Sequence, residues 1–586
     1  MSEFSLVCER WIPCIDLHGN RVEYGIRDTL AKAHELREIC DDSPLVTVAI
    51  HRMLLALLYR AFAGPTDLTG WKAIWQNGRF EGNQQIDEYL KKWHDRFWLF
   101  DDQSPFMQVA GLDLSEYKKD GTVKLTKGLN KALDGAMRLA KEAPDIGGRI
   151  LFDHRMGTEK PEYPCRVLIR MLLANQSFAG TGIPSAGKIG DSPINPYKPF
   201  PNDKEKKVGC TAAPGVEGLI LWLQGDNLFQ TMMLNLVPQE VCPSDLPAWE
   251  DDHIVQSAIN SWQSPVSFSG PVQRFAPLSR FVRLVDKASI FFTNGLKASS
   301  DANDPMKPYS RASSTEEYKP IKLREAKAAW RDAHTLFSLG SSLRKPPAAL
   351  NHVLRAAGFL AGSLPRANVV GMATDKDKAL LWRHDRMPVP IRILESADLG
   401  ERLATLLGEA ETIGSDLSQG LFWSQTAKKT IRNEPVGRVQ SIADLLISPA
   451  MQIDAYGNTR TTEGRAPEEA HNKAAMDLSD SIDPRPAYWS RLEQHFFDLL
   501  ENLRNDWDHD KGEWKPDDQQ HATNTWRKEV RREAKRALEE SIRSLGNTAR
   551  AIHAVARVRT DFNDDDLKLP ARKVAKGKPN GGKKKK

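Results

Sequence analysis

Apolar residues recur every three or four positions in the last third of the chain, after about residue 395. This spacing places apolar side chains on one face of an α-helix. Two segments have it, with Leu399, Leu403, Leu406, Ala410 and Ile413 in the first and Trp489, Leu492, Phe496, Leu499 and Leu503 in the second. A third has a more polar version, with Trp526, Val530, Ala534, Ala537 and Ser541. With another helix expected near 418–432, these segments predict an antiparallel four-helix bundle over residues 391–560.

The first 390 residues combine two kinds of pattern. Short runs at 1–30 and between 216 and 300 indicate strands separated by turns and loops. Apolar residues at helical spacing predict helices at 44–63, 83–96, 323–338 and 346–361. The predicted fold class is therefore α+β, with a large mixed α/β N-terminal domain over residues 1–390 followed by the C-terminal four-helix bundle.

The distribution of charge limits how the chain can meet nucleic acid. The formal net charge of the 586 residues is +5, but residues 571–586 contain eight Lys and Arg and no acidic residue. The rest of the chain is therefore slightly acidic, and contacts with nucleic acid require local basic patches or partner proteins. Residues 561–586 are predicted to form a disordered basic tail, and the Pro- and Lys-rich stretch 191–215 a mobile loop.

Cysteine usage and hydropathy predict a cytoplasmic protein. None of the six cysteines forms a C-x-x-C pair, which disfavours a zinc ribbon or a disulfide scaffold and predicts free thiols in a reducing compartment. The most apolar long stretch, Pro44 to Gly64, contains His51, Arg52 and Arg60 and is predicted to be a buried helix rather than a membrane span. No signal peptide opens the sequence, and no metal or cofactor site is expected.

A segment rich in glycine, NQSFAGTGIPSAGKIGD at 175–191, follows an apolar helical stretch. Because glycine has no Cβ, such a loop can bring its main chain close to a flat surface such as DNA. Gly182, Gly187 and Lys188 also have the spacing of a phosphate-binding P-loop. However, Ile189 stands where that motif needs Ser or Thr, and a helix rather than a strand precedes the loop. Nucleotide hydrolysis is therefore disfavoured, and an ordinary surface loop remains an alternative.

His384 and Asp385 are adjacent, like the metal ligands of some phosphohydrolases. No further cluster of His and Asp supports them, and the sequence has neither G-x-S-x-G nor H-E-x-x-H. A structural pair of hydrogen-bonding residues is the favoured interpretation, and no catalytic residue is predicted.

Basic residues form a stripe on the last predicted helix. Arg527, Arg531 and Lys535 are spaced four apart, and the adjacent row of Lys528, Arg532 and Arg536 has the same spacing. Glu529, Glu533, Glu539 and Glu540 partly neutralise the stripe. The two interpretations are a solvated face of ion pairs and a surface that binds phosphates, for which Arg527, Arg531 and Lys535 are the candidates.

The order of several segments resembles the CasA family, the large subunit of the type I-E CRISPR Cascade surveillance complex. The segments that carry the resemblance are ERWIPC near the N-terminus, DRFWLFDDQSPFMQ at 95–108, ANQSFAGTG, SIFFTNGL at 289–296, GMATDKDKALLWRHD at 371–385 and PAYWSRLEQHFFDLL in the bundle. Each motif is weak alone, but their shared order covers most of residues 5–550 and is specific.

The resemblance implies roles for particular residues. Ala179, Gly180, Thr181 and Gly182 correspond to a glycine loop that lies against the minor groove of DNA, with Ala179 in place of an expected glycine. Lys287 corresponds to a lysine finger, although Ala288 fits the spacing equally well. The tripeptide Asp375-Lys376-Asp377 corresponds to a wedge that separates the strands, and its two acids depart from the amide side chain expected there. A turn between a strand and a helix is the alternative for this segment. Phe152, in the polar loop 152–164, corresponds to a contact with the guide RNA and neighbouring subunits.

The function implied is that of a noncatalytic subunit of a guide-RNA surveillance complex. Such a subunit recognises the protospacer-adjacent motif in double-stranded DNA, promotes strand opening and helps to recruit a helicase-nuclease. The expected partners are target DNA, guide RNA, the other Cascade subunits and that effector. Two alternatives remain, a metal-dependent nuclease or nucleotide hydrolase that uses His384 and Asp385 or the glycine loop, and a scaffold without DNA contacts of its own.

Overall fold

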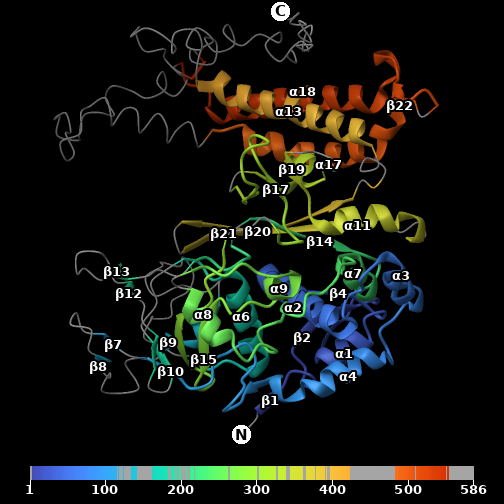
Figure 1. The fold of residues 1–586 in the computed structure, drawn as a ribbon. Helices are drawn as coiled ribbons and strands as arrows, with labels where there is room; N and C mark the ends of the chain where they lie inside the picture. The colour runs from blue at the N-terminus through green and yellow to red at the C-terminus, as the bar shows by residue number, and fades with distance from the viewer. Residues whose placement is uncertain are drawn as a thin grey trace, which may run out of the picture. The chain divides into compact units, whose positions relative to one another are not determined.

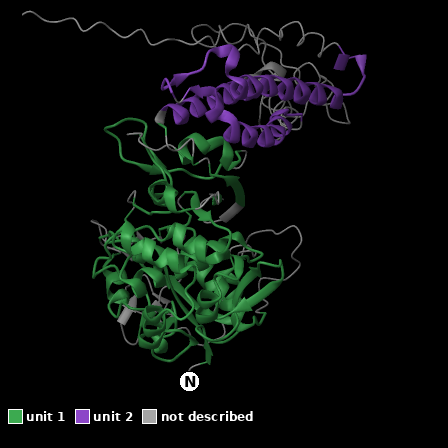
Figure 2. Ribbon diagram, turned by 90° about the vertical axis from the view of Figure 1, so that its right-hand side faces the viewer, with its two compact units in different colours: residues 1–397 green, residues 398–586 purple. Residues whose placement is uncertain are grey.

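The computed structural model divides the chain into two compact units, Met1–Ala397 and Asp398–Lys586 (Figure 2). It describes residues 3–114, 116–117, 123–124, 134–140, 161–181, 187–189, 192–194, 197–198, 206–207, 211–216, 218–261, 264–299, 303–324, 327–337, 343–360, 365–375, 378–389, 391, 396–422, 482–508, 510–549 and 551–552. Both helices and antiparallel strands make up the first unit, as its mixed sequence pattern predicts (Figure 1).

The chain begins with short strands packed on a long buried helix. Strand β2 (Ile12–Asp16) pairs antiparallel with β3 (Arg21–Tyr24) and β4 (Leu36–Ile39). Strand β1 (Glu3–Ser5) pairs with β5 (Trp98–Phe100). The helices that follow are α1 (Ile26–Ala31), α2 (Pro44–Phe62), α3 (Leu68–Asn77) and α4 (Gln84–Lys92).

Helix α2 lies in the core of the first unit. Pro44 occupies its first turn, where no N–H is needed, and the Ser43 hydroxyl accepts the N–H of Val46 at 3.4 Å. Among the described helices it is the one long and apolar enough to cross a membrane, and 83% of that stretch is buried inside the protein. Arg52 on this helix is itself buried and pairs with Asp304 at 2.8 Å. The prediction of a buried helix at 44–63 is confirmed.

The region 216–300 contains helices that the sequence pattern did not predict. Strands β14 (Ile220–Gln224), β15 (Arg280–Leu284) and β16 (Ser289–Asn294) match the expected strands, but α7 (Leu228–Asn235), α8 (Ile254–Ser261) and α9 (Pro271–Phe275) lie between them. Helix α7 is buried over most of its surface, so it shows no amphipathic period, and its start depends on the Asn227 side chain, which accepts the N–H of Gln230.

Two other predictions for the first unit differ from the structure. The helix expected at 323–338 is confined to its last part, η3 (Ala329–Asp332) and α10 (Ala333–Leu336), whereas α11 (Ala348–Ala356) lies where a helix was predicted. Within the predicted loop 191–215, short strands occur at β11 (Ser192–Ile194), β12 (Tyr197–Lys198) and β13 (Lys206–Lys207). The shorter strands elsewhere are β6 (Leu112–Leu114), β7 (Glu116–Tyr117), β8 (Val123–Lys124), β9 (Asp134–Gly135), β10 (Gly187–Ile189), β17 (Tyr309–Ser310), β18 (Lys319–Pro320) and β19 (Arg344–Lys345).

Three long helices make up most of the described part of the second unit, α13 (Ala397–Phe422), α17 (Arg485–Asn502) and α18 (His521–Ser544) (Figure 1). They contact one another closely: the Tyr488 hydroxyl donates to the carbonyl of Ala410 at 3.0 Å, and a Cβ on Gly414 would lie 2.6 Å from the Trp489 ring. The helix predicted at 418–432 begins inside α13, which continues without a break to residue 422, and its remainder lies outside the described residues. The strands β22 (Trp507–Asp508) and β23 (Glu513–Trp514) form a small hairpin before α18.

The five cysteines that the structure describes, Cys8, Cys14, Cys40, Cys165 and Cys242, are free thiols, as predicted. Burial raises the pKa of the Cys14 thiol to about 12, so this cysteine is held in its neutral form.

Candidate nucleic-acid interface

The predicted glycine loop begins where helix α6 (Cys165–Phe178) ends. Ala179 is the C-cap and is 2% exposed; its N–H donates to the carbonyl of Asn175 at 2.9 Å, and its own carbonyl accepts the N–H of Ala213 at 2.8 Å. Gly180 is half-buried and Thr181 is exposed, whereas Gly182 lies outside the described residues. The chain therefore emerges from the core at Gly180, on a helix whose last eight residues are all buried.

A buried arginine holds the start of this loop. Arg280, at the beginning of β15, is 2% exposed, and its guanidinium donates to the main-chain carbonyls of Thr211 at 2.9 Å and of Gly180. Gln176, one turn before the loop, accepts the N–H of Arg280 at 2.9 Å and donates to its carbonyl at 2.8 Å. Neither residue was predicted as functional, because no sequence motif relates position 176 to position 280.

The predicted wedge lies at the tip of a long hairpin, formed by β20 (Arg366–Asp375) and β21 (Lys378–Pro388). Asp375 is the last residue of β20, and Lys376 and Asp377 lie outside the described residues. The segment thus connects two strands, and the alternative of a turn between a strand and a helix is wrong. The chain leaves the sheet after Asp375 and returns to it at Lys378.

The hairpin tip and the glycine loop lie toward the same end of the sheet. The N–H of Gly215 donates to the carbonyl of Ser177 at 2.7 Å, which places residues 213–215 beside the end of α6. The chain then enters β14, which begins with Ile220 opposite Val370. Since β14 and β20 are antiparallel, the part of β20 after Val370 extends beyond the start of β14, toward the side from which residues 213–219 arrive.

Lys287, the predicted finger, lies in the turn between β15 and β16, far from the glycine loop. The Asp286 side chain closes this turn by accepting the N–H groups of Ala288 and Ser289, both at 2.7 Å. The carbonyl of Lys287 accepts the N–H of Tyr163, just before α6, so the start of the helix lies beside the turn. The 14 residues of α6, at about 1.5 Å each, separate the two ends by roughly 20 Å.

The surroundings of Lys287 are acidic. Its Nζ lies 3.7 Å from Glu3 Oε1, and a pocket of about 430 Å³ beside it is lined by Glu3, Asp101, Asp102, Glu162 and Asp286. Arg283 is the other basic residue in that lining. These carboxylates repel anionic groups, so the surroundings of Lys287 are unfavourable for a phosphate.

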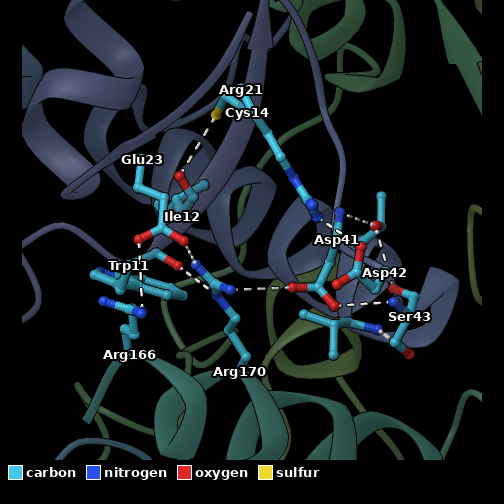
Figure 3. Close-up of polar contacts among 12 residues, drawn as sticks. Trp11, Ile12, Cys14, Arg21, Glu23, Asp41, Asp42, Ser43, Arg166 and Arg170 are labelled. Carbon is cyan, nitrogen blue, oxygen red and sulfur yellow. Dashed lines mark hydrogen bonds and ion pairs between the residues drawn. The ribbon is translucent and has the colours of Figure 1, made fainter. Parts of the chain in front are cut away.

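The start of α6 is tied to the N-terminal strands by a second arginine (Figure 3). Arg170 Nε donates to the carbonyl of Trp11 at 2.7 Å, and its Nη2 lies 2.5 Å from Glu23 Oε1. Its Nη1 lies 3.4 Å from Asp41, a carboxyl group whose pKa is raised by burial. Helix α6 is thus fixed by polar contacts at both ends, by Arg170 near its start and by Arg280 at its end.

On α18 the structure separates the members of the basic stripe. Arg527 forms two hydrogen bonds with Glu409 of α13, at 2.8 and 2.9 Å, and Arg532 contacts Glu529 and Glu533. Lys528, Arg531 and Lys535 are exposed on the helix. Arg527 thus connects two helices of the unit, and these three exposed cations are the better candidates for contacts with phosphates.

His384 and Asp385 do not form a joint site. As neighbours on β21 they point to opposite faces of the sheet. His384 Nε2 lies 2.9 Å from Asn368 Oδ1, and Asp385 accepts the N–H of Ala329 at 2.7 Å. Burial, helped by Arg386, lowers the pKa of His384 to about 4. Both residues therefore have structural partners, as favoured from the sequence.

The residues Gly187 and Lys188 do not have the structural setting of a P-loop. Gly187 and Lys188 lie in strand β10, and Lys188 Nζ is 3.6 Å from Asp113, so this pair does not open a helix as a P-loop requires.

Among the described residues, His495, Glu529 and Glu533 have ligand atoms within 4.8 Å of one another. Arg532 already contacts both carboxylates of that cluster, which makes it an ion-pair network. Phe152 lies outside the described residues.

Comparisons with known proteins agree on one family. The family model described as CRISPR-associated protein Cse1 matches residues 5–537. The CRISPR-associated protein CasA/Cse1 of Thermus thermophilus is 25% identical over 577 residues, which cover 96% of this chain and 97% of that protein. A crystal structure of Thermus thermophilus CasA is similar with a TM-score of 0.71 at 23% identity, covering 96% of this chain and 99% of the other. A chain of a structure called a CRISPR RNA-guided surveillance complex is similar with a TM-score of 0.65 at 16% identity, covering 96% and 99%. At these identities the structural likeness concerns the fold.

Proposed function

Since this chain belongs to the CRISPR-associated protein Cse1 family, we propose that it is a noncatalytic subunit of a guide-RNA surveillance complex. In this proposal it recognises the protospacer-adjacent motif in double-stranded DNA, promotes opening of the duplex and helps to recruit a helicase-nuclease. Sequence identity is then read by pairing with the guide RNA, and this subunit reads the short motif.

One observation carries the proposal: the main chain leaves the core at Gly180, and the β20–β21 hairpin runs toward the same end of the sheet. A loop without bulky side chains can lie close to the edges of base pairs in the minor groove. A hairpin tip at the same end of the sheet is suited to enter between base pairs and to unstack them, at a cost of a few kcal/mol per step. Ala179, Gly180, Thr181 and Gly182 read the motif, and Asp375, Lys376 and Asp377 form the wedge.

Lys287 has a separate role in this proposal. A distance of roughly 20 Å along α6 corresponds to about six base pairs of B-DNA. Lys287 and the glycine loop therefore contact different parts of a bound duplex, and the acidic surroundings of Lys287 direct it to base acceptors rather than to phosphates.

The second unit completes the proposal. Residues 391–560 form a four-helix bundle that holds DNA through Arg531, Lys535 and Lys528, with Arg527 binding both Glu409 and the neighbouring phosphates. Phe152 contacts the guide RNA and a neighbouring subunit. The complex acts in the cytoplasm, where its target DNA lies, and needs no cofactor of this chain.

The test is to assemble the guide-RNA complex with and without this chain and to measure its affinity for duplexes that match the guide. The duplexes differ only in a randomised flank next to the target, and sequencing of the bound fraction gives the flank preference. We expect a preference that depends on this chain. An equal affinity for all flanks, or cleavage of DNA by the purified chain alone in the presence of divalent metal, would contradict the proposal.

A further inference from the structure

Arg280 is a fully buried arginine placed directly behind the loop that is proposed to read DNA. It lies at the start of β15, is 2% exposed, and reaches the loop from a part of the chain about 100 residues away. A guanidinium carries five N–H donors in a fixed plane, so it can bind several carbonyl oxygens at once and hold them at set angles to one another.

The contacts of this guanidinium connect three separate pieces of main chain. Nη1 donates to the carbonyl of Ser279 at 2.6 Å, and Nη2 donates to the carbonyls of Thr211 at 2.9 Å and of Gly180. The carbonyl of Ala179 lies 3.5 Å from Nη2. The chain before the loop, the chain after it and the strand behind it are therefore bound to a single side chain.

Gln176 makes this arrangement rigid. Its amide both accepts from and donates to the main chain of Arg280, at 2.9 and 2.8 Å, and also donates to the carbonyl of Met107 at 3.2 Å. The helix turn that carries the loop is thereby fixed to β15. A charged group in a buried site makes stronger hydrogen bonds than it would in water, and breaking them requires more free energy.

Binding of the Gly180 carbonyl by Arg280 also orients the peptide that follows. In a planar trans peptide the N–H points opposite to the C=O. The peptide between Gly180 and Thr181 therefore turns its carbonyl toward the core and its N–H away from Arg280. Thr181 itself is exposed.

We infer that Arg280 is a positioning residue for motif recognition: it fixes the conformation of the glycine loop from inside the protein and does not itself contact DNA. This inference rests on the function proposed above. A loop that recognises DNA through its main chain needs a fixed conformation before binding, because ordering it on binding lowers affinity and discrimination. In this inference the buried side chain of Arg280 provides that fixed conformation. Arg280 Nη2 also binds the carbonyl of Thr211, so the chain at Thr211 is held together with the start of the loop.

The experiment compares Arg280→Met with Arg274→Met, both in the full chain assembled with guide RNA. Arg274 is the matched control because it is also buried, at 6% exposed, and donates to a main-chain carbonyl, that of Phe268 at 3.0 Å. For Arg280→Met we expect the ratio of affinities between the best and worst flanks to fall by about tenfold, the contribution of one good contact to a base pair. The dependence of affinity on salt should stay unchanged, because no phosphate contact is lost. Arg274→Met should keep the wild-type ratio even where its melting temperature falls.

Amide hydrogen exchange gives a second readout in the same proteins. Exchange at Ala179 and Ala213, whose N–H groups donate to the carbonyls of Asn175 and Ala179, should become faster in Arg280→Met and stay unchanged in Arg274→Met. Arg280→Lys, which keeps the buried charge but not the planar set of donors, should give an intermediate ratio and serves where the Met variant does not fold. A wild-type flank ratio in a folded Arg280 variant would overturn the inference. A wild-type complex without any flank preference would instead overturn the proposed function.

Discussion

The glycine loop at the end of α6 and the exposed face of α18 are both proposed to meet DNA, but they are held in different ways. The buried guanidinium of Arg280 fixes the loop from behind by donating to its main chain, and the buried amide of Gln176 fixes the main chain of Arg280. On α18 the cations lie on the surface, and those that are fixed, such as Arg527 and Arg532, are fixed by carboxylates of the same unit.

This difference corresponds to two kinds of recognition. Discrimination between base pairs needs donors and acceptors at set positions, so the groups that provide it must be ordered before DNA arrives. Binding of phosphates needs only charge within reach, and long side chains on a helix surface provide it at any sequence. We therefore expect the first unit to determine which DNA is bound, and the second unit to determine how tightly and at what salt concentration.

The largest expected effect is that of Gly180→Asp on affinity for the preferred flank. A side chain and a negative charge at the point where the loop leaves the core would push the duplex away, with a loss of about 2 kcal/mol or more, roughly 30-fold. Affinity for the worst flank should change little. Duplex binding by the assembled complex measures both. Gly358→Asp is the control, because nothing lies within 4 Å of a Cβ at the exposed Gly358 and its backbone is not in the left-handed region. Equal losses for all flanks would mean that the loop does not read sequence.

The second prediction uses pH to separate the two units. Burial, aided by the nearby His384, lowers the pKa of His51 to about 3, so the folded first unit keeps this histidine neutral. Below its ordinary pKa of about 6.5 the unfolded chain binds a proton that the folded chain does not, and stability falls as the pH falls. From pH 7 to pH 5 this amounts to about 2 kcal/mol.

His51→Gln should reduce this loss, as measured by the melting temperature of the first unit at both pH values. The second unit should change less over the same range, since its ion pairs need carboxylates that stay ionised above pH 5. The pKa of Glu540, for example, is lowered by its hydrogen bond with Arg491. The same fall in melting temperature for His51→Gln and the wild type would show that His51 does not titrate as its burial implies.

Lys528→Ala combined with Arg531→Ala tests the phosphate contacts of α18. Two lost contacts should reduce the slope of log affinity against log salt by about 2 and weaken binding by about tenfold at low salt. The flank preference should stay that of the wild type, which is the opposite of the result expected for Gly180→Asp. A series of affinities between low and moderate salt measures the slope. Arg536→Ala is the control, because Arg536 pairs with Glu540. A change in flank preference would contradict the division between the units.

The smallest effect concerns the ion pair of Lys287 with Glu3. Both side chains are about half exposed, and such a pair contributes roughly 1 kcal/mol or less. Glu3→Gln should free the lysine and speed association with DNA by a few-fold at low salt, and Lys287→Ala should remove that gain. Association rates of the two single variants and the double variant measure the coupling. A gain from Glu3→Gln that persists in the Lys287→Ala background would assign the effect to the acidic pocket as a whole.

Helix spacing and turn residues predicted much of the local structure correctly. The buried helix at 44–63 follows from Leu45, Val48 and Leu54 on a stretch without acidic residues, and the apolar stripes predicted the faces of α17 and α18 that are buried. The helices α7, α8 and α9 were missed. Helix α7 is buried on most sides and shows no amphipathic pattern, and α8 and α9 have only eight and five residues, too few for a sequence pattern to detect.

The amino-acid sequence alone determined the long amphipathic helices and the starts of α2, α3 and α4, because apolar spacing and side-chain caps act within a few positions of the chain. Only the tertiary structure decided which polar residues serve the proposed interface. Residues 176 and 280 come together through packing over about 100 residues, and Arg527 meets Glu409 across two helices. A hydrogen bond depends on the final distance between two groups, and that distance is set by the whole fold rather than by the neighbours of either residue along the chain.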